Sequence, residues 1–265
     1  MQNNLYYNKH RNGLLIGKSD YNKLSNFNKY QKSLKSICFD NHEIYFLSPY
    51  WFLHSLKEIY IEEVYKFNAD KEEPVIIDCG ANIGLSILYF KNLYQKAKII
   101  AFEPDPHIMT LLKKNIAVYQ YDDVKLINAA VWTEETNILF YSEGSVGGKI
   151  DFNASTKSNQ VEVPTIRLKD YLHSKVDFLK IDIEGAEYDV LKDCRELLNN
   201  VEHLFIEYHV ERDKPQYLHE ILEWVNAAGF IYYIREAQNN MSYPFLKSYD
   251  DYYQMQLNVF CYRIN

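Results

Sequence analysis

Charged side chains follow two apolar segments in the second half of the chain. The first segment reads FLKIDIEGAE at residues 178–187, and the second reads IEYH at residues 206–209. Charges in a buried strand persist only when they are paired or functional. A carboxylate and an imidazole can orient or remove the proton of a hydroxyl group, so Asp182 and His209 are candidate catalytic residues, with Lys180 beside them. The alternatives are a structural pair between Lys180 and Asp182 and a hydrogen-bonded structural His209.

A glycine-rich turn follows an apolar segment earlier in the chain, in VIIDCGANIG at residues 75–84. Asp78, Gly80, Asn82 and Gly84 form the pattern D-x-G-x-N-x-G. Glycine allows close approach of the backbone to a ligand or a positive φ, and the N-terminus of the next helix offers unpaired N–H donors. The pattern predicts a nucleotide-type cradle, but it does not match the G-x-G-x-x-G of dinucleotide-binding folds.

A carboxylate ends the next apolar segment, where Glu103 follows Asp78 by 103 − 78 = 25 residues. In doubly wound folds an acidic residue near this spacing accepts hydrogen bonds from ribose hydroxyls. Pro104 favours an extended Glu103 that points off the strand end. A surface glutamate that caps the following helix is the alternative for this signal alone. The cradle and Glu103 together favour bound adenosine.

Short β-rich segments alternate with helical periods from about residue 74 onward. This alternation predicts an α/β fold with a parallel sheet and helices at 106–118 and 215–228. Ligands of open α/β sheets bind outside the carboxyl ends of the strands, so the groups above should surround one crevice. The expected strands are residues 75–77, 99–102, 124–127, 178–181, 204–206, 231–234 and 257–262.

The first 70 residues have a different pattern. Residues 3–28 are polar and rich in Asn, Lys and Tyr and are expected to be a loose arm, whereas 37–47 predict a hairpin and 49–67 a helix. No linker-like stretch follows them. Residues 1–70 are therefore expected to be an N-terminal cap on a catalytic domain at 71–265.

Composition excludes several classes of protein. The chain has 265 residues, 47% of them apolar, and a formal charge of 29 − 36 = −7 without a basic block, which argues against nucleic-acid partners. The first 20 residues lack the core of a signal peptide, and no apolar run is long enough for a membrane span. Four cysteines without a CxxC pair indicate free thiols. A cytoplasmic protein is expected.

The chain resembles the FkbM family of S-adenosylmethionine-dependent methyltransferases over roughly residues 60–265. The resemblance rests on IIDCGANIG, FEPDP, NAAV at residues 128–131, the loop at 144–148, LKIDIEGAEYDVL and FIEYH, with YIEEVY at 60–65 before them. It implies a class I methyltransferase (Rossmann-like) fold. Such a fold is a doubly wound α/β sheet of seven mostly parallel strands, with the last strand inserted antiparallel.

The resemblance also implies S-adenosylmethionine as the cofactor and places its binding residues. The glycine-rich turn would hold the methionine part, the end of the next strand the ribose, and the segment at 128–129 the adenine edge. The implied cofactor-binding residues are Asp78, Gly80, Ala81, Asn82, Gly84, Glu103, Pro104, Asn128 and Ala129.

The resemblance implies O-methyl transfer to a sugar hydroxyl or another polar group of a cell-surface polysaccharide (capsule) or its nucleotide-linked precursor. Glu184, Glu207 and Gly147 are expected to contact this small-molecule or saccharide acceptor, and residues 144–149 are either a flap over it or an ordinary hairpin turn. The alternatives are a natural-product O-methyltransferase, an enzyme of another class that binds a different nucleotide, and an inactive nucleotide-binding module.

A divalent ion is the alternative to metal-free base catalysis at the same residues. Asp182, Glu207 and His209 offer oxygen and imidazole ligands that suit Mg²⁺ or Mn²⁺. The expectation is a site without metal, because Lys180 and His209 bring positive charge to it. His209, with an ordinary pKa near 6.5, is the expected general base, and Asp182 would orient it or bind the acceptor.

Overall fold

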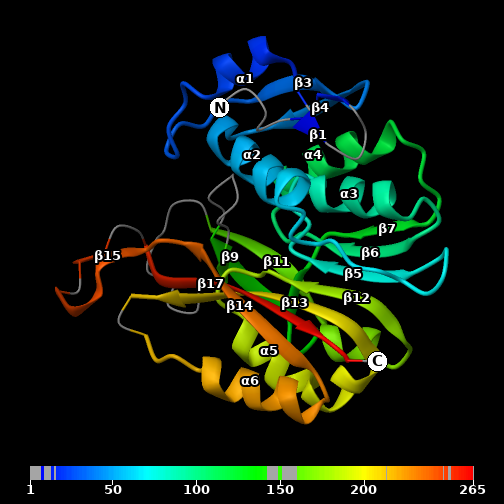
Figure 1. Cartoon of the computed structure of the whole chain (residues 1–265), viewed down its shortest axis with the longest axis vertical. Coiled ribbons are helices and arrows are strands. Elements are labelled where there is room, and N and C mark those ends of the chain that lie inside the picture. Colours follow the sequence, from blue (N-terminus) through cyan, green and yellow to red (C-terminus); the bar gives the residue numbers. More distant parts are fainter. Residues whose placement is uncertain are drawn as a thin grey trace.

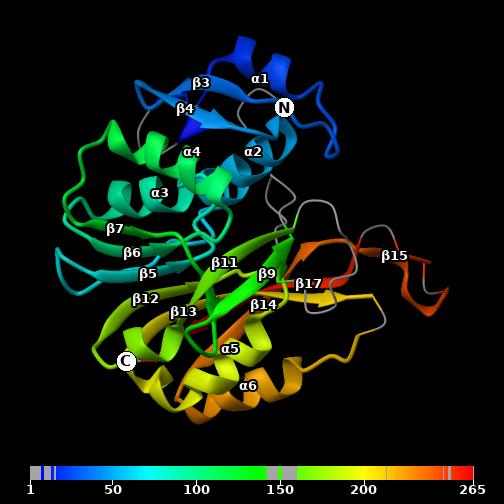
Figure 2. The ribbon, with the colours of Figure 1, turned by 180° about the vertical axis from the view of Figure 1, so that it is seen from behind.

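A seven-stranded sheet between two layers of helices forms the body of the protein (Figure 1). The structure is a computed structural model that describes residues 7–8, 13–14, 16–141, 149–150, 160–212, 214–246, 248–249 and 252–264, with the backbone alone for 7–8, 13–14, 149–150 and 248–249. Helices α3 (Leu85–Leu93) and α4 (Pro106–Ala117) cover one face. Helices α5 (Glu187–Cys194) and α6 (Leu218–Ala227) cover the other face, as Figure 2 shows from behind.

The strand order in this sheet is β14-β17-β13-β12-β5-β6-β7. Only β17 runs antiparallel, between β13 and β14, as the resemblance implied. The predicted class of fold is therefore confirmed. The strands are β5 (Val75–Cys79), β6 (Lys98–Phe102), β7 (Val124–Ile127), β12 (Val176–Ile181), β13 (Val201–Glu211), β14 (Ile231–Gln238) and β17 (Tyr253–Tyr262).

Two apolar cores lie on the two faces of the sheet because successive side chains of a strand point to opposite faces. Ile76 packs in the core under α3 and α4, and Ile77 packs in the core over α5 and α6. The helix boundaries follow local signals. The Asp105 carboxylate accepts hydrogen bonds from the first turn of α4, and Gly229 takes a φ of +83° just after α6.

The N-terminal cap packs on the α3–α4 side of the sheet (Figure 1). The predicted hairpin is present, and its turn residues Asp40 and Asn41 have positive φ. The expected loose arm is wrong in part, because it contains a helix and buries Ile16 and Leu24 in the core. The elements are β1 (Tyr7–Asn8), β2 (Gly13–Leu14), α1 (Lys18–Leu24), β3 (Lys35–Phe39), β4 (His42–Phe46), α2 (Pro49–Leu56) and the π-helix η2 (Lys57–Ile61).

A second sheet of four strands, in the order β10-β9-β11-β8, was not anticipated from the sequence. Its buried Phe140 and Val163 form a small core of their own with Ala130. Its strands are β8 (Ala130–Trp132), β9 (Asn137–Tyr141), β10 (Lys149–Ile150) and β11 (Gln160–Arg167). The remaining elements are the 3₁₀ turns η3 (Leu168–Tyr171), η4 (Arg195–Asn200) and η5 (Pro244–Leu246), and the pair β15 (Met241–Tyr243) and β16 (Ser248–Tyr249).

Two sequence expectations about the chain as a whole can be compared with the structure. All four cysteines are free thiols, as expected. Among the described residues, no helix has the length and apolar character needed to cross a membrane.

Candidate active site

A cavity of about 900 Å³ opens at the carboxyl ends of β5, β6, β12 and β13. Its walls come from the glycine-rich turn, the segment after β6, the ends of β12 and β13, and the N-terminal cap. This volume lies near the upper end of the range for small-molecule sites. The predicted crevice is therefore present, and the cap contributes a wall that the sequence did not suggest.

The glycine-rich turn after β5 owes its glycines to close packing within the chain. A Cβ on Gly80, whose φ is +91°, would lie 1.9 Å from the carbonyl oxygen of Asp182. A Cβ on Gly84, whose φ is +95°, would lie 2.7 Å from the Leu112 side chain on α4. The two glycines thus let β12 and α4 approach the turn. Gly80, Ala81 and Asn82 line the cavity.

Glu103 fastens the glycine-rich turn to the end of β6. Its side-chain oxygens accept hydrogen bonds from the backbone N–H of Asn82 and of Asp105, each at 2.9 Å. Burial raises the pKa of the carboxyl to about 8. Asn128 donates to the carbonyls of Glu103 and Pro104 and so fixes the segment from behind. A carboxylate has about four lone-pair sites, so Glu103 can still accept from the hydroxyls of a ribose.

Lys180 joins the ends of β5 and β12 beneath the cavity. Its ammonium lies 3.3 Å from Asp78 and 3.2 Å from Asp182, and it donates to the carbonyl of Gly80 at 2.8 Å. Burial lowers its pKa, but the charges of Asp182 and Asp78 outweigh burial and raise the pKa well above the usual value. Asp78 also accepts a hydrogen bond from Ser86. Lys180 is a fixed cation that positions Asp182.

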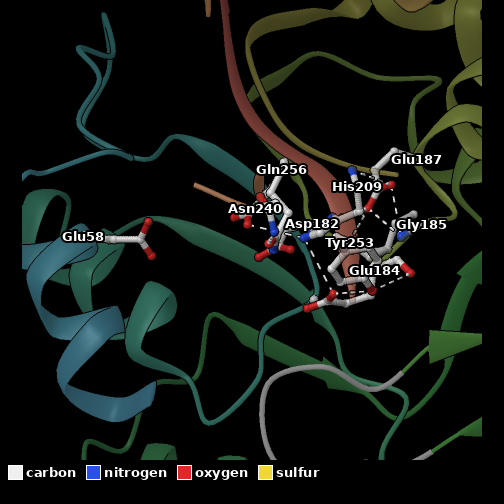
Figure 3. Close-up of polar contacts among 12 residues, drawn as sticks. Glu58, Asp182, Glu184, Gly185, Glu187, His209, Asn240, Tyr253 and Gln256 are labelled. Atoms are coloured by element: carbon white, nitrogen blue, oxygen red, sulfur yellow. Dashed lines mark hydrogen bonds and ion pairs between the residues drawn. The ribbon is translucent and has the colours of Figure 1, made fainter. Parts of the chain in front are cut away.

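Three glutamates contact one buried histidine, His209 of β13, and Figure 3 shows Glu184 and Glu187 near it. Nδ1 of His209 lies 3.0 Å from Glu187, and Nε2 lies 3.3 Å from Glu207 and 3.6 Å from Glu184. Burial lowers the pKa of His209, but the charges of Glu184 and Glu187 and the contacts with Glu187 and Glu207 raise it well above 6.5. We call Asp182, Glu184, Glu187, Glu207 and His209 the strand-end cluster.

The strand-end cluster differs from the expectation that His209 is an ordinary imidazole. The side chain of His209 is 1% exposed, and its raised pKa makes it an imidazolium that holds Glu184 and Glu207. His209 is buried because of its tertiary contacts. Strand β17 pairs with β13 as far as Glu211, so Glu207 and His209 lie within β13 rather than after it. Asp182 and Glu207, with side chains 23% and 17% exposed, face the cavity.

Asp182, Glu207 and His209 also form a group that can hold a metal ion. Each offers one ligand atom, and these atoms lie within 4.8 Å of one another. A metal at this place would have to displace the proton of His209. The structure therefore brings the three predicted ligands together, and protonated His209 is a cation that competes with a metal ion for the same position.

The structure divides the predicted site residues into three groups. Gly147, with most of the expected flap at 144–149, lies outside the described residues. Asp78, Gly84 and Asn128 do not line the cavity but contact residues that do, and their expected contact with the cofactor stays a prediction. The predicted residues that line the cavity are Gly80, Ala81, Asn82, Glu103, Pro104, Ala129, Lys180, Asp182, Glu184, Glu207 and His209.

Several site residues were missed by reasoning from the sequence. Glu187 is one of them, although a carboxylate in the first turn of a helix after a charged strand end is a recognisable signal. Tyr253, which lies near the C-terminal end of the sequence, donates a hydrogen bond of 2.8 Å from its hydroxyl to the Glu184 carboxylate. His54 and Glu58 of the cap also line the cavity, and their spacing of four residues on a helix was the available signal.

The strand order with an antiparallel last strand is that of the class I methyltransferase fold, and the glycine-rich turn and Glu103 lie where such α/β sheets bind ligands. The model of the methyltransferase FkbM domain matches residues 78–232, and the chain belongs to this family. The family is one of methyltransferases, and its cofactor is S-adenosylmethionine.

Curated relatives match about half of the chain. Methyltransferase 1 of Beauveria bassiana is 29% identical over 53% of this chain and 66% of its own length, and methyltransferase sdnD of Sordaria araneosa is 32% identical over 51% and 66%. The 2-O-methyltransferase NoeI of Sinorhizobium fredii is 26% identical over 52% of this chain and 65% of its own length. The matches thus span just under two thirds of these relatives.

Solved structures share the fold at low sequence identity. Methyltransferase FkbM from Methylobacillus flagellatus superposes with a TM-score of 0.50 at 13% identity, over 91% of this chain and 58% of that chain. The SAM-dependent methyltransferase from Agrobacterium tumefaciens gives a TM-score of 0.50 at 10% identity, over 87% and 70%. At such identities the likeness shows the fold alone.

Proposed function

We propose that the protein methylates a hydroxyl of a saccharide, in a cell-surface polysaccharide such as a capsule or in its nucleotide-linked precursor. The observation that carries the proposal is the continuity of the cavity, which runs from Glu103 and the glycine-rich turn to the carboxylates of Asp182 and Glu207. Such carboxylates accept hydrogen bonds from hydroxyl groups. The name of the relative NoeI, a 2-O-methyltransferase, supports transfer to oxygen.

The cavity offers aromatic surface as well as acceptors. Tyr188, Tyr208 and Tyr253 line it, and aromatic side chains combine a flat apolar face with a polar edge. The net charge of −7 argues against a polyanionic nucleic acid as the acceptor. A hydroxyl-rich, flat-faced ligand such as a sugar fits this combination.

Positioning supplies much of the rate in the proposed reaction. The bound cofactor supplies an electrophilic methyl group, and the protein must hold the acceptor oxygen in line with it. Asp182 and Glu207 would bind the acceptor hydroxyl, because both are partly exposed to the cavity. Lys180 and His209 hold these two carboxylates in place from below.

Labelled methyl transfer tests the proposal. The purified protein is incubated with methyl-labelled S-adenosylmethionine and nucleotide-linked hexoses, methyl hexosides or capsule fragments, and in separate reactions with phenols and carboxylic acids. We expect label in the saccharide reactions, in a product that resists mild alkali as an ether does. Asp182→Asn and Glu207→Gln should raise the KM for the acceptor and leave cofactor affinity within about twofold. Label in the phenol or carboxylic acid reactions alone would favour a natural-product methyltransferase instead.

A further inference from the structure

The N-terminal cap forms the wall of the cavity opposite the strand-end cluster. Trp51, His54 and Ser55 on α2 and Glu58 and Ile59 on η2 line the same cavity as Asp182 and Glu207. These cap residues precede the segment 78–232 that the family model matches. Figure 3 shows Glu58 projecting from its helix toward Asp182. This wall therefore belongs to the N-terminal cap, and it can contact an acceptor that is bound at the strand ends.

His54 and Glu58 form an oriented pair on this wall. Nδ1 of His54 lies 3.2 Å from the Glu58 carboxylate, and the two side chains are 33% and 22% exposed. The Trp51 ring packs edge-on against the imidazole, with ring centroids 5.4 Å apart. Among the described residues, Nε2 of His54 has no hydrogen-bond or ion-pair partner. A carboxylate on one ring nitrogen and an open position on the other is the arrangement of a histidine base.

A local irregularity of the helix carries Glu58. The helix changes from α to π at Lys57, and the N–H of Glu62 donates to the carbonyl of Lys57, five residues back, at 2.9 Å. Single π-turns within helices are rare and occur frequently at functional sites. Here the wide turn spans Glu58 and Ile59, two of the residues that face the cavity.

Two other nitrogen bases of the cavity, His209 and Lys180, are enclosed. His209 is 1% exposed, and carboxylates face both of its ring nitrogens. Lys180 is 3% exposed and is a cation held by Asp78 and Asp182. Among the described residues that line the cavity, His54 and His209 are the histidines, so His54 is the imidazole that an acceptor can reach.

We infer that His54, oriented by Glu58, takes the proton from the acceptor hydroxyl during methyl transfer. The inference deepens the proposed function and rests on it. The acceptor oxygen forms its new bond to the methyl carbon while the carbon–sulfur bond breaks, and sulfur keeps that electron pair. The hydroxyl proton passes to Nε2 of His54. The acceptor would thus lie between the cap and the strand-end cluster.

The charges around His54 favour a strong base. Burial lowers its pKa, but contact with Glu58 and the charges of Glu58 and Glu207 raise it overall above 6.5, against a smaller opposing effect of Lys57. Neutral His54 is the form that can accept a proton. The rate should therefore increase with pH through a value above 6.5.

Two variants and a matched control test the inference. His54→Gln removes the base, and Glu58→Gln removes the partner that orients it, whereas His173→Gln removes an exposed histidine outside the cavity. With an accepted saccharide, His54→Gln should lower kcat/KM by ~10²–10⁴-fold, the usual range for a general base. S-adenosylmethionine affinity by calorimetry should stay within about twofold in all three variants. The pH-dependent limb should persist in His209→Asn and disappear in His54→Gln.

A readout without turnover makes the test independent of the acceptor. In NMR spectra of ¹³C-histidine-labelled full-length protein, the His54 signal is assigned by its loss in His54→Gln. We expect its pKa to exceed 6.5 and to decrease in Glu58→Gln. Methyl hexosides added with S-adenosylhomocysteine should shift this signal and leave that of His173 unchanged.

The outcomes separate the two proposals. Turnover by His54→Gln equal to wild type overturns the role of His54 and leaves the proposed function intact. A His54 signal with an ordinary pKa, unmoved by Glu58→Gln, also overturns it. No saccharide methylation by the wild-type protein, together with no shift of the His54 signal by any methyl hexoside, overturns both.

Discussion

Replacing Glu103 by glutamine tests the assignment of the ribose subsite most directly. Glutamine keeps the size of the side chain and removes its charge. In the native protein the carboxylate accepts two backbone hydrogen bonds at 2.9 Å, from Asn82 and Asp105, and is 6% exposed. Ribose hydroxyls would add charge-assisted bonds to the same oxygens, and such bonds contribute about 1.5–3 kcal/mol. Loss of the charge should therefore weaken S-adenosylmethionine binding by ~10- to 150-fold.

The pH dependence of binding provides a second check on the same carboxyl group. Burial raises the pKa of Glu103 to about 8, and the ribose requires the carboxylate form. Affinity of the wild-type protein should increase from pH 6 to 8, by at most about tenfold per pH unit, and level off above pH 8. The affinity of the Glu103→Gln variant for the same ligand should not increase between pH 6 and 8.

Calorimetry with S-adenosylhomocysteine measures both effects, and thermal unfolding confirms that each variant is folded. Glu196→Gln is the matched control, because Glu196 has a side chain that is 70% exposed and does not line the cavity. Glu103→Ala should weaken binding further, since it also leaves two backbone N–H groups without their acceptor. A folded Glu103→Gln protein with wild-type affinity would refute the ribose assignment.

Three further predictions concern stability and metal dependence. Gly80→Ala should lower the free energy of unfolding by more than Gly185→Ala. Both glycines have positive φ, which costs about 1–3 kcal/mol for a residue with a side chain, but only a Cβ at position 80 would meet another atom at 1.9 Å. Equal losses of stability in denaturant titrations would contradict this expectation. Without cofactor, the free energy of unfolding should decrease from about pH 4.5 to 8. Burial raises the folded-state pKa of Glu103 and of Glu184 to about 8, so in this range the folded protein binds more protons than the unfolded chain. A free energy of unfolding that is constant or increases over this range would contradict those shifts. Methyl transfer should survive exhaustive chelation, because protonated His209 already places a positive charge where the metal would bind. Activity that is lost with EDTA and restored by one divalent metal would place an ion there instead.

Local signals in the sequence were sufficient for the strands of the main sheet and for a prediction of where the cofactor binds. The alternation of apolar segments and helical periods predicts the strands of the main sheet, because the period of buried residues is set by backbone geometry. The glycine-rich turn is recognisable within ten residues of chain, and Glu103 is recognisable by its spacing of 25 residues from Asp78. The second sheet was missed because β9 does not alternate apolar and polar residues: Leu139, between Ile138 and Phe140, is apolar but exposed.

The chemical state of the acceptor end was decided only by the tertiary structure. Lys180 contacts a carbonyl 100 residues away, and Tyr253 reaches Glu184 across 69 residues. From the sequence, His209 is expected to be an ordinary histidine. In the structure three glutamates from the β12–α5 segment and β13 enclose it and raise its pKa. Burial and charge depend on partners that are distant in sequence, so no local pattern can set the protonation of His209 or place His54 opposite it. The sequence thus determined which groups are present, and the fold decided which of them an acceptor can reach.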